Sequence, residues 1–120
     1  MRGFFYFILC KIPLFGAFVE IESMHEFQKK MLEVKECLVV IGMSPCIPCE
    51  KLKKTLIAEE SNLPDIYYID LKKYPRIRHV FSFKAVPFLA VYQNGEQLKS
   101  LTGESSCRDY LINIRCSEQK

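Results

Sequence analysis

Two cysteines three positions apart, in Cys46-Ile47-Pro48-Cys49, are the residues of this chain best placed to do chemistry. They follow an apolar run, residues 37–43, and precede a run with helical spacing, residues 50–60. Thiols at this spacing, at a turn between a strand and a helix, can form a reversible disulfide. Zinc sites use the same spacing, but a zinc site would need two further ligands elsewhere in the chain.

Cys46 is predicted to be the more reactive thiol, because it falls where a helix would begin. The free backbone N–H groups of a first helical turn stabilise a thiolate, which is the nucleophile in disulfide exchange. Cys49, one turn inside the helix, would be more shielded and would resolve the mixed disulfide. Pro48 has no N–H to offer and stiffens the loop. A structural disulfide, or two buried free thiols, is the alternative interpretation.

The spacing of apolar residues predicts strands and helices on either side of the motif. Residues 18–21 and 66–69 are predicted strands, and residues 37–43 a buried strand covered on both faces. Ser23, with Glu26 three residues later, is typical of a helix N-terminus. Two further sets are expected to mark buried helix faces: Phe27, Met31 and Val34 in the first helix, and Leu52, Leu56 and Ile57 after the motif.

A proline-led hairpin is predicted in the second half of the chain. Pro87 precedes the apolar run of residues 88–92, a position that suits the start of a strand. Asn94-Gly95 is a strong hairpin-turn signal, and residues 96–101 would pair back. Pro75 suits the first turn of a short helix. Residues 104–116 are a predicted final helix whose inward side carries Tyr110, Leu111 and Ile114.

In this order the elements resemble the thioredoxin family over roughly residues 18–116. The resemblance rests on Phe18-Val19-Glu20-Ile21-Glu22-Ser23, the strand of residues 37–43, the Cys46-Ile47-Pro48-Cys49 motif, Ile66-Tyr67-Tyr68-Ile69-Asp70, Val86-Pro87, Gln93-Asn94-Gly95-Glu96 and Gly103. It implies an α/β thioredoxin fold, with a central mixed β-sheet flanked by helices on both faces. Residues 18–120 would form this thioredoxin-like domain, after a hydrophobic extension of residues 1–17.

The resemblance implies a thiol-disulfide oxidoreductase that needs no metal and no organic cofactor. Cys46 and Cys49 would be the catalytic, redox-active disulfide pair. Ile47, Pro48, Val86 and Pro87 would form the substrate-binding residues, with Pro87 after a cis peptide bond and the Val86 backbone pairing with an extended substrate segment. The partners implied are protein disulfide substrates and a recycling reductase or oxidant. The alternative is a redox-idle adaptor that binds a partner protein through the cis-proline groove.

Several positions depart from the family pattern. Pro45 stands where the family has a tryptophan, Ile47 where it has a glycine, and Lys54 where it has a helix-kinking proline. The buried acid that assists the resolving cysteine aligns with Val40, and its lysine partner with Ile66. Without that acid Cys49 would exchange its proton with water or another base. These departures favour an oxidoreductase of restricted substrate range, and they leave the direction of its redox chemistry open.

The remaining cysteines and histidines are expected to serve packing or to lie on the surface. Cysteines outside a redox or metal motif are often buried. The residues concerned are Cys37, Cys107 and Cys116 as packing residues, His25 and His79 on the surface, and Cys10 in the N-terminal extension. No standard zinc spacing joins them, so no metal site is predicted.

The charge of the chain indicates no nucleic-acid partner, because a net charge of +3 over 120 residues is small. One stretch is nevertheless basic and without acids: it holds Lys72, Lys73, Arg76, Arg78, His79 and Lys84. Solvated helix faces explain such a stretch, and the alternative is steering of an acidic partner protein.

Residues 1–17 do not decide in which cellular compartment the protein resides. Arg2 and the apolar residues after it resemble a short signal peptide, but Lys11 interrupts them and Phe15 stands where a small residue is wanted. A hydrophobic extension that packs on the domain is the first interpretation, and a cytoplasmic protein is then expected. An export signal or membrane anchor, with membrane contact through residues 1–17, is the alternative.

Overall fold

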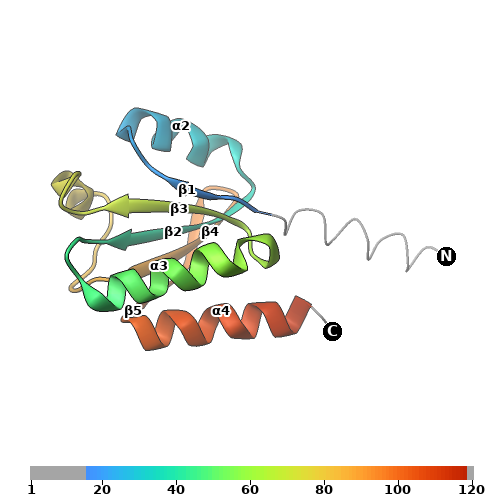
Figure 1. Cartoon of the computed structure of the whole chain (residues 1–120). Coiled ribbons are helices and arrows are strands. Elements are labelled where there is room, and N and C mark those ends of the chain that lie inside the picture. Colours follow the sequence, from blue (N-terminus) through green and yellow to red (C-terminus); the bar gives the residue numbers. More distant parts are fainter. Residues whose placement is uncertain (1–15, 119–120) are drawn as a thin grey trace.

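A five-stranded sheet lies between helices in the computed structural model, which describes residues 16–118 and side chains as far as residue 114 (Figure 1). The strands are β1 (Phe18–Glu20), β2 (Glu36–Gly42), β3 (Asp65–Asp70), β4 (Phe88–Gln93) and β5 (Glu96–Thr102). The α-helices are α2 (Met24–Glu33), α3 (Ile47–Glu59) and α4 (Glu104–Glu118), and the 3₁₀ helices are η2 (Glu60–Asn62) and η3 (Pro75–His79).

The strand order is β1-β3-β2-β4-β5, so the strand that leads to the cysteine motif lies in the middle of the sheet. β1, β3 and β2 run parallel, whereas β4 pairs antiparallel with β2 and β5 antiparallel with β4. Residues 37–42 of β2 are all buried. A strand covered on both faces buries both alternating sets of side chains, which is why this run is continuously apolar. The predicted mixed sheet and its buried central strand are confirmed.

Each face of the sheet has its own core. α2 and η3 cover one face, where Phe27 and Ile77 are buried. α3 and α4 cover the other, where Leu52, Leu56 and Leu111 are buried. In Figure 1, α2 accordingly lies on the opposite side of the sheet from α3 and α4.

The prediction for one residue of the buried α3 face is wrong. Ile57 was expected to share the buried side with Leu52 and Leu56, but it is 48% exposed. Leu52 and Leu56 are four positions apart and stack along one stripe of the helix. Ile57 follows Leu56 by one position, about 100° further around the helix axis, and so leaves that stripe.

The local signals for caps and turns are confirmed. The Ser23 Oγ accepts a hydrogen bond from the Glu26 N–H over 3.3 Å and caps α2. Asn94 and Gly95 have φ values of 54° and 82°, as a tight turn between two twisted antiparallel strands requires. The β4–β5 hairpin therefore forms where its turn signal places it.

The topology brings four chain segments to one edge of the sheet. β2 and β3 end together, with Gly42 beside Asp70, and β4 begins there, with Phe88 opposite Ile41. β5 ends at the same edge, where Thr102 pairs with Phe88. The cysteine motif, the basic stretch, the cis-proline segment and the start of α4 consequently meet at this edge.

The first described residues are joined to the domain. The Gly16 N–H donates to the Leu63 carbonyl over 3.0 Å, and the Ala17 N–H to Asp65 Oδ1 over 3.1 Å. The rest of the extension assigned to residues 1–17 lies outside the described residues, so its interpretation as packed extension, signal or anchor stays a prediction. Within residues 16–118, no helix is both long enough and apolar enough to cross a membrane.

Candidate active site

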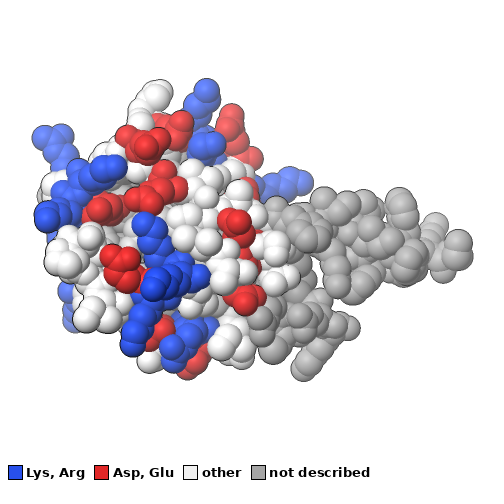
Figure 2. Space-filling view, in the orientation of Figure 1, with Lys and Arg blue, Asp and Glu red and all other residues white. Residues whose placement is uncertain are grey.

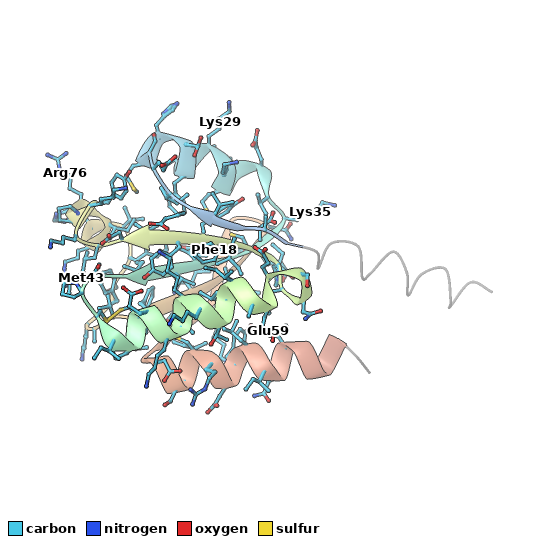
Figure 3. The ribbon with its side chains drawn as sticks, in the orientation of Figure 1. Phe18, Lys29, Lys35, Met43, Glu59 and Arg76 are labelled. Atoms are coloured by element: carbon cyan, nitrogen blue, oxygen red, sulfur yellow. A yellow bond between two sulfur atoms is a disulfide. The ribbon has the colours of Figure 1, made fainter. Side chains whose placement is uncertain are left out.

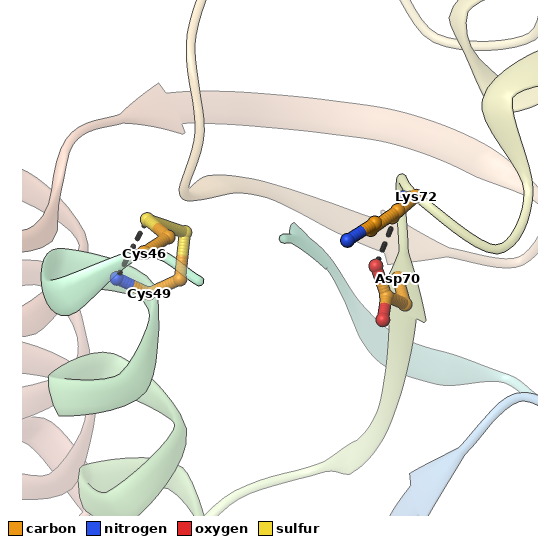
Figure 4. The surroundings of a disulfide bond; sticks show 4 residues. All are labelled: Cys46, Cys49, Asp70 and Lys72. Carbon is orange, nitrogen blue, oxygen red and sulfur yellow. Dashed lines mark hydrogen bonds between the residues drawn. A yellow bond between two sulfur atoms is a disulfide. The ribbon is translucent and has the colours of Figure 1, made fainter. Parts of the chain in front are cut away.

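The Cys46–Cys49 pair lies at the N-terminus of α3, as predicted. Cys46 is the N-cap residue, and its sulfur accepts a hydrogen bond from the Cys49 N–H over 3.2 Å (Figure 4). The Cys46 carbonyl accepts the first backbone bond of the helix, from the Glu50 N–H, over 2.9 Å. The two sulfurs are joined in a disulfide, with the Cα atoms 5.2 Å apart. A thiolate at Cys46 would keep that N–H as a donor and would lie at the positive end of the helix dipole.

The two cysteines differ in their access to solvent. Cys46 is partly exposed, whereas Cys49 is 0% exposed. A bulky substrate can therefore approach the first sulfur and not the second. This asymmetry matches the roles expected of an attacking and a resolving thiol.

The segment before β4 holds the second predicted feature. The Val86–Pro87 peptide bond is cis, as the resemblance implied, and Pro87 is buried. The Pro87 carbonyl accepts a hydrogen bond from the Gly103 N–H over 2.9 Å, which fixes the proline segment to the start of α4. A second cis bond, Ser44–Pro45, precedes the motif and was not predicted.

The structure brings the four predicted substrate-binding residues together. Ile47, Pro48, Val86 and Pro87 line one groove of about 380 Å³ beside the disulfide. Further lining residues were not predicted: Lys51 on α3, Gly103, and Glu104, Ser105 and Ser106 in the first turn of α4. Gly103 formed part of the family resemblance, but only the pairing of β4 with β5 places it beside Pro87.

The core beneath the motif contains no acid. Val40 and Ile66, the positions of the family's buried acid and its lysine partner, are both 0% exposed and lie in the core with Leu52 and Leu56. Among residues 16–114, no Asp, Glu, Lys, Arg or His side chain is buried. Cys49 therefore has no carboxylate in the core of the described domain to take its proton.

A polar pocket that was not predicted lies beside the motif. Glu50, Lys53, Tyr68 and Asp70 are among its lining residues, and the Lys53 ammonium lies 5.0 Å from the centre of the Tyr68 ring. Burial raises the pKa of Tyr68 to about 12, with the carboxylates of Asp70, Glu50 and Glu20 adding to the shift. The phenol is protonated at neutral pH, so Tyr68 can donate a hydrogen bond and cannot serve as a base.

The other described cysteines are packing residues. Burial, helped by nearby carboxylates, raises the pKa of Cys37 and of Cys107 to about 12. Neither thiol is accessible, at 2% and 0% exposure, so neither competes with Cys46 as a nucleophile. His25 and His79 are exposed, as predicted. Cys10 and the side chain of Cys116 lie outside the described part of the chain.

Comparison with known proteins identifies the fold and not the family. No protein-family model matches the sequence, and no curated protein is significantly similar to it. Solved structures do match: a thioredoxin of Malassezia sympodialis has a TM-score of 0.70 at 17% identity, covering 86% of this chain and 92% of that one. A mutant thioredoxin of Halobacterium salinarum gives 0.72 at 17% identity, with coverages of 87% and 92%. Spinach chloroplast thioredoxin f gives 0.67 at 15% identity, with coverages of 89% and 97%. The predicted thioredoxin fold is confirmed.

Proposed function

We propose that this thioredoxin-fold protein is a thiol-disulfide oxidoreductase that acts on the disulfides of other proteins. The observation that carries the proposal is the difference between its two sulfurs. Cys46 caps α3, accepts the Cys49 N–H and is partly exposed beside a groove, while Cys49 is buried. A structural disulfide would need neither the capping position nor the groove.

The reaction is a two-step exchange. The Cys46 thiolate attacks one sulfur of the substrate disulfide, so that a mixed disulfide forms and the departing substrate sulfur leaves as a thiolate. The Cys49 thiolate then attacks Cys46 Sγ, closing the internal disulfide and releasing the second substrate thiolate. Two electrons pass to the substrate, whose two thiolates take up the two protons that the protein dithiol gave up. A partner dithiol returns the pair to its reduced form, and an oxidant partner would drive the same steps in reverse.

The groove favours an extended polypeptide as substrate. Val86 precedes the cis-proline at the start of β4, and an extended segment could add there by backbone pairing. Ile47 is 73% exposed and offers an apolar contact immediately after Cys46. Substrate contact with Ile47, Pro48, Val86 and Pro87 is part of the proposal.

The apolar core beneath the motif supports a restricted range of substrates. Because Val40 supplies no acid, the proton of Cys49 must pass to water or to a base other than a buried carboxylate. Release of the mixed disulfide would then depend on how well a substrate is held in the groove. A general, fast reductant of many proteins is a poorer fit to this site.

Trapping of the mixed disulfide tests the proposal. Cys49→Ser should accumulate a disulfide between Cys46 and a cystine-containing protein, because the resolving thiol is missing, and Cys46→Ser should accumulate none. Cys107→Ala, which removes a buried thiol, is the matched control and should behave like the unsubstituted protein. Intact mass spectrometry after acid quenching measures the amount of mixed disulfide in each of the three variants. If Cys49→Ser forms no adduct, the oxidoreductase proposal fails and an adaptor that binds through the Pro87 groove takes its place.

The direction of the reaction follows from the reduction potential of the Cys46–Cys49 pair. Equilibration against glutathione, with trapping and mass spectrometry, measures it. A value near about −270 mV would make the protein a reductase, and one near about −120 to −180 mV an oxidant or isomerase.

A further inference from the structure

A basic surface lies at the same edge of the sheet as the disulfide. From Leu71 to Gly95 the chain contains no Asp or Glu. This stretch contains five Lys and Arg residues, all exposed, which we call the basic loop: Lys72, Lys73, Arg76, Arg78 and Lys84. In Figure 2, Lys and Arg side chains line the end of the molecule at which β2 and β3 end, on the left of the view.

The fold holds the basic loop in place. The Leu71 N–H donates to the Gly42 carbonyl over 2.8 Å, so the loop starts beside the segment that leads to Cys46. Ile77 is 0% exposed and anchors η3 in the core, which leaves its neighbours Arg76 and Arg78 facing solvent. Figure 3 shows Arg76 at the same end of the molecule as Met43, the residue that follows β2.

Lys72 of the basic loop lies in the surroundings of the disulfide (Figure 4). Its backbone N–H donates to Asp70 Oδ1 over 2.9 Å, which turns the chain at the end of β3. From that turn its side chain extends toward the side on which the Cys46–Cys49 disulfide lies (Figure 4). Lys84 lies two residues before Val86, at the other end of the loop, so the basic loop leads directly into the groove.

The charge of the basic loop is not neutralised within the described domain. The ion pairs among residues 16–114 join Lys53 to Glu20 and Arg108 to Glu104, and neither includes the loop. Of the acids near the motif, Glu20, Glu50 and Asp70 line the polar pocket, with Asp70 directly before the basic loop, and Glu104 lines the groove, where it pairs with Arg108. Like charges on one exposed stretch repel one another, and an acidic partner would offset that repulsion.

We propose that the substrates are acidic polypeptides, whose cystine is flanked by Asp or Glu side chains that contact the basic loop. This inference rests on the proposed oxidoreductase function and names the substrate class of the same site. The disulfide enters beside Ile47 and Pro87, and the flanking carboxylates lie over Lys72, Arg76 and Lys84. Charge complementarity of this kind mainly raises the rate of association and suppresses wrong partners.

Single-turnover exchange with matched peptides tests the inference. Protein reduced with dithiothreitol and freed of it is mixed at low salt with cystine-linked peptide dimers whose flanks carry Glu, Gln or Lys. Acid quenching and chromatography follow the reaction, and the uncharged disulfide of 2-mercaptoethanol is the reference. The Glu peptide should react about tenfold faster than the Gln peptide, and the Lys peptide slowest, with the differences shrinking in high salt.

Charge-reversal variants locate the effect. Lys72→Glu/Arg76→Glu should lower the Glu-to-Gln rate ratio about tenfold, since steering contributes factors of about 10 to 10³. Lys29→Glu/Lys35→Glu changes the net charge equally and should keep the ratio. Both positions are exposed, Lys29 on α2 and Lys35 just after it, and Figure 3 shows both farther than Arg76 from Met43, the residue that follows β2. Each rate is divided by the rate of the same variant with the uncharged reference, so a change in the intrinsic reactivity of Cys46 does not affect the comparison.

Two outcomes would overturn the inference while the oxidoreductase function stands. In the first, the reduced protein reacts with the reference and with all three peptides at equal relative rates. In the second, the Lys29/Lys35 variant loses the ratio as fully as the Lys72/Arg76 variant, so that net charge alone decides. The first outcome needs no variant to fold. If the reference and every peptide fail to react, the proposed function itself is wrong and the substrate class falls with it.

Discussion

The phenolic oxygen of Tyr68 on β3 lies against the backbone of Gly42, the last residue of β2, where the chain leaves the sheet for Cys46. A Cβ at position 42 would overlap that oxygen and lie 2.7 Å from the ring carbon that carries it. Tyr68 is 5% exposed, and its ring contacts both the Phe18 ring and the Lys53 ammonium. The chain therefore approaches the active site through a close contact that leaves no room for a side chain at position 42.

Gly42→Ala should therefore destabilise the protein. The strand or the ring must shift to admit a methyl group, which typically costs about 1–3 kcal/mol of the free energy of unfolding. Tyr68→Phe removes the nearest atom, so the double variant should recover part of the loss. Urea denaturation of the four proteins measures the coupling, and strictly additive losses would show that the two residues do not constrain each other.

The described cysteines should differ strongly in how fast they are alkylated in the reduced protein. Iodoacetamide at pH 8 should modify Cys46 and leave Cys37 and Cys107 unmodified, because both are buried and the pKa of each is raised to about 12. Peptide mass mapping reads each cysteine individually, and labelling in concentrated urea shows that both buried thiols can react once exposed. Labelling of Cys37 as fast as Cys46 in the native protein would contradict the assigned burial.

Stability should fall in alkaline solution. In the folded protein the pKa values of Cys37 and Cys107 are about 12, against 9.0 for the free side chain, and that of Tyr68 is about 12 against 10.0. Between pH 9 and pH 12 the unfolded chain loses these protons while the folded chain keeps them. The folded state then binds more protons, so the free energy of unfolding decreases as pH rises.

Urea denaturation at several values between pH 8 and pH 11 measures this decrease. Cys37→Ala/Cys107→Ala should show a shallower decline above pH 9, since two of the titrating groups are gone. An unchanged slope in that variant would mean that the buried thiols do not contribute to the pH dependence.

The sequence predicts those parts of the fold whose signals are local. Ser23 caps its helix through the residue three positions later, Asn94-Gly95 makes its own turn, and Cys46 caps α3 through Cys49. Each depends on a few neighbouring residues, so its residue types alone indicate the conformation. The order of these elements carried the resemblance to the thioredoxin family, and that resemblance predicted the mixed sheet.

The parts that depend on contacts between distant segments could not be predicted. Gly103 and Glu104 line the groove because β5 returns beside β4 and the Gly103 N–H reaches the Pro87 carbonyl. The Tyr68–Gly42 contact depends on the register of β3 against β2. No local sequence pattern indicates either of these pairings between distant segments. The role of these residues is therefore visible only in the three-dimensional structure.

An acid introduced at position 40 should destabilise the protein, because the core beneath α3 is apolar. Val40 is 0% exposed and packs with Leu52 and Leu56, so Val40→Asp places an unpaired carboxylate there and should cost about 3–5 kcal/mol at pH 7. Burial raises the pKa of the new carboxyl above about 3.9, its unfolded value. The folded state then favours the protonated form, so part of the stability should return as pH falls from 7 to about 4.5. Val40→Asn has nearly the same shape and no charge, and its loss should not depend on pH in that way. Urea denaturation of both variants at the two pH values measures their free energies of unfolding. If the two variants change equally with pH, the introduced carboxyl reaches solvent.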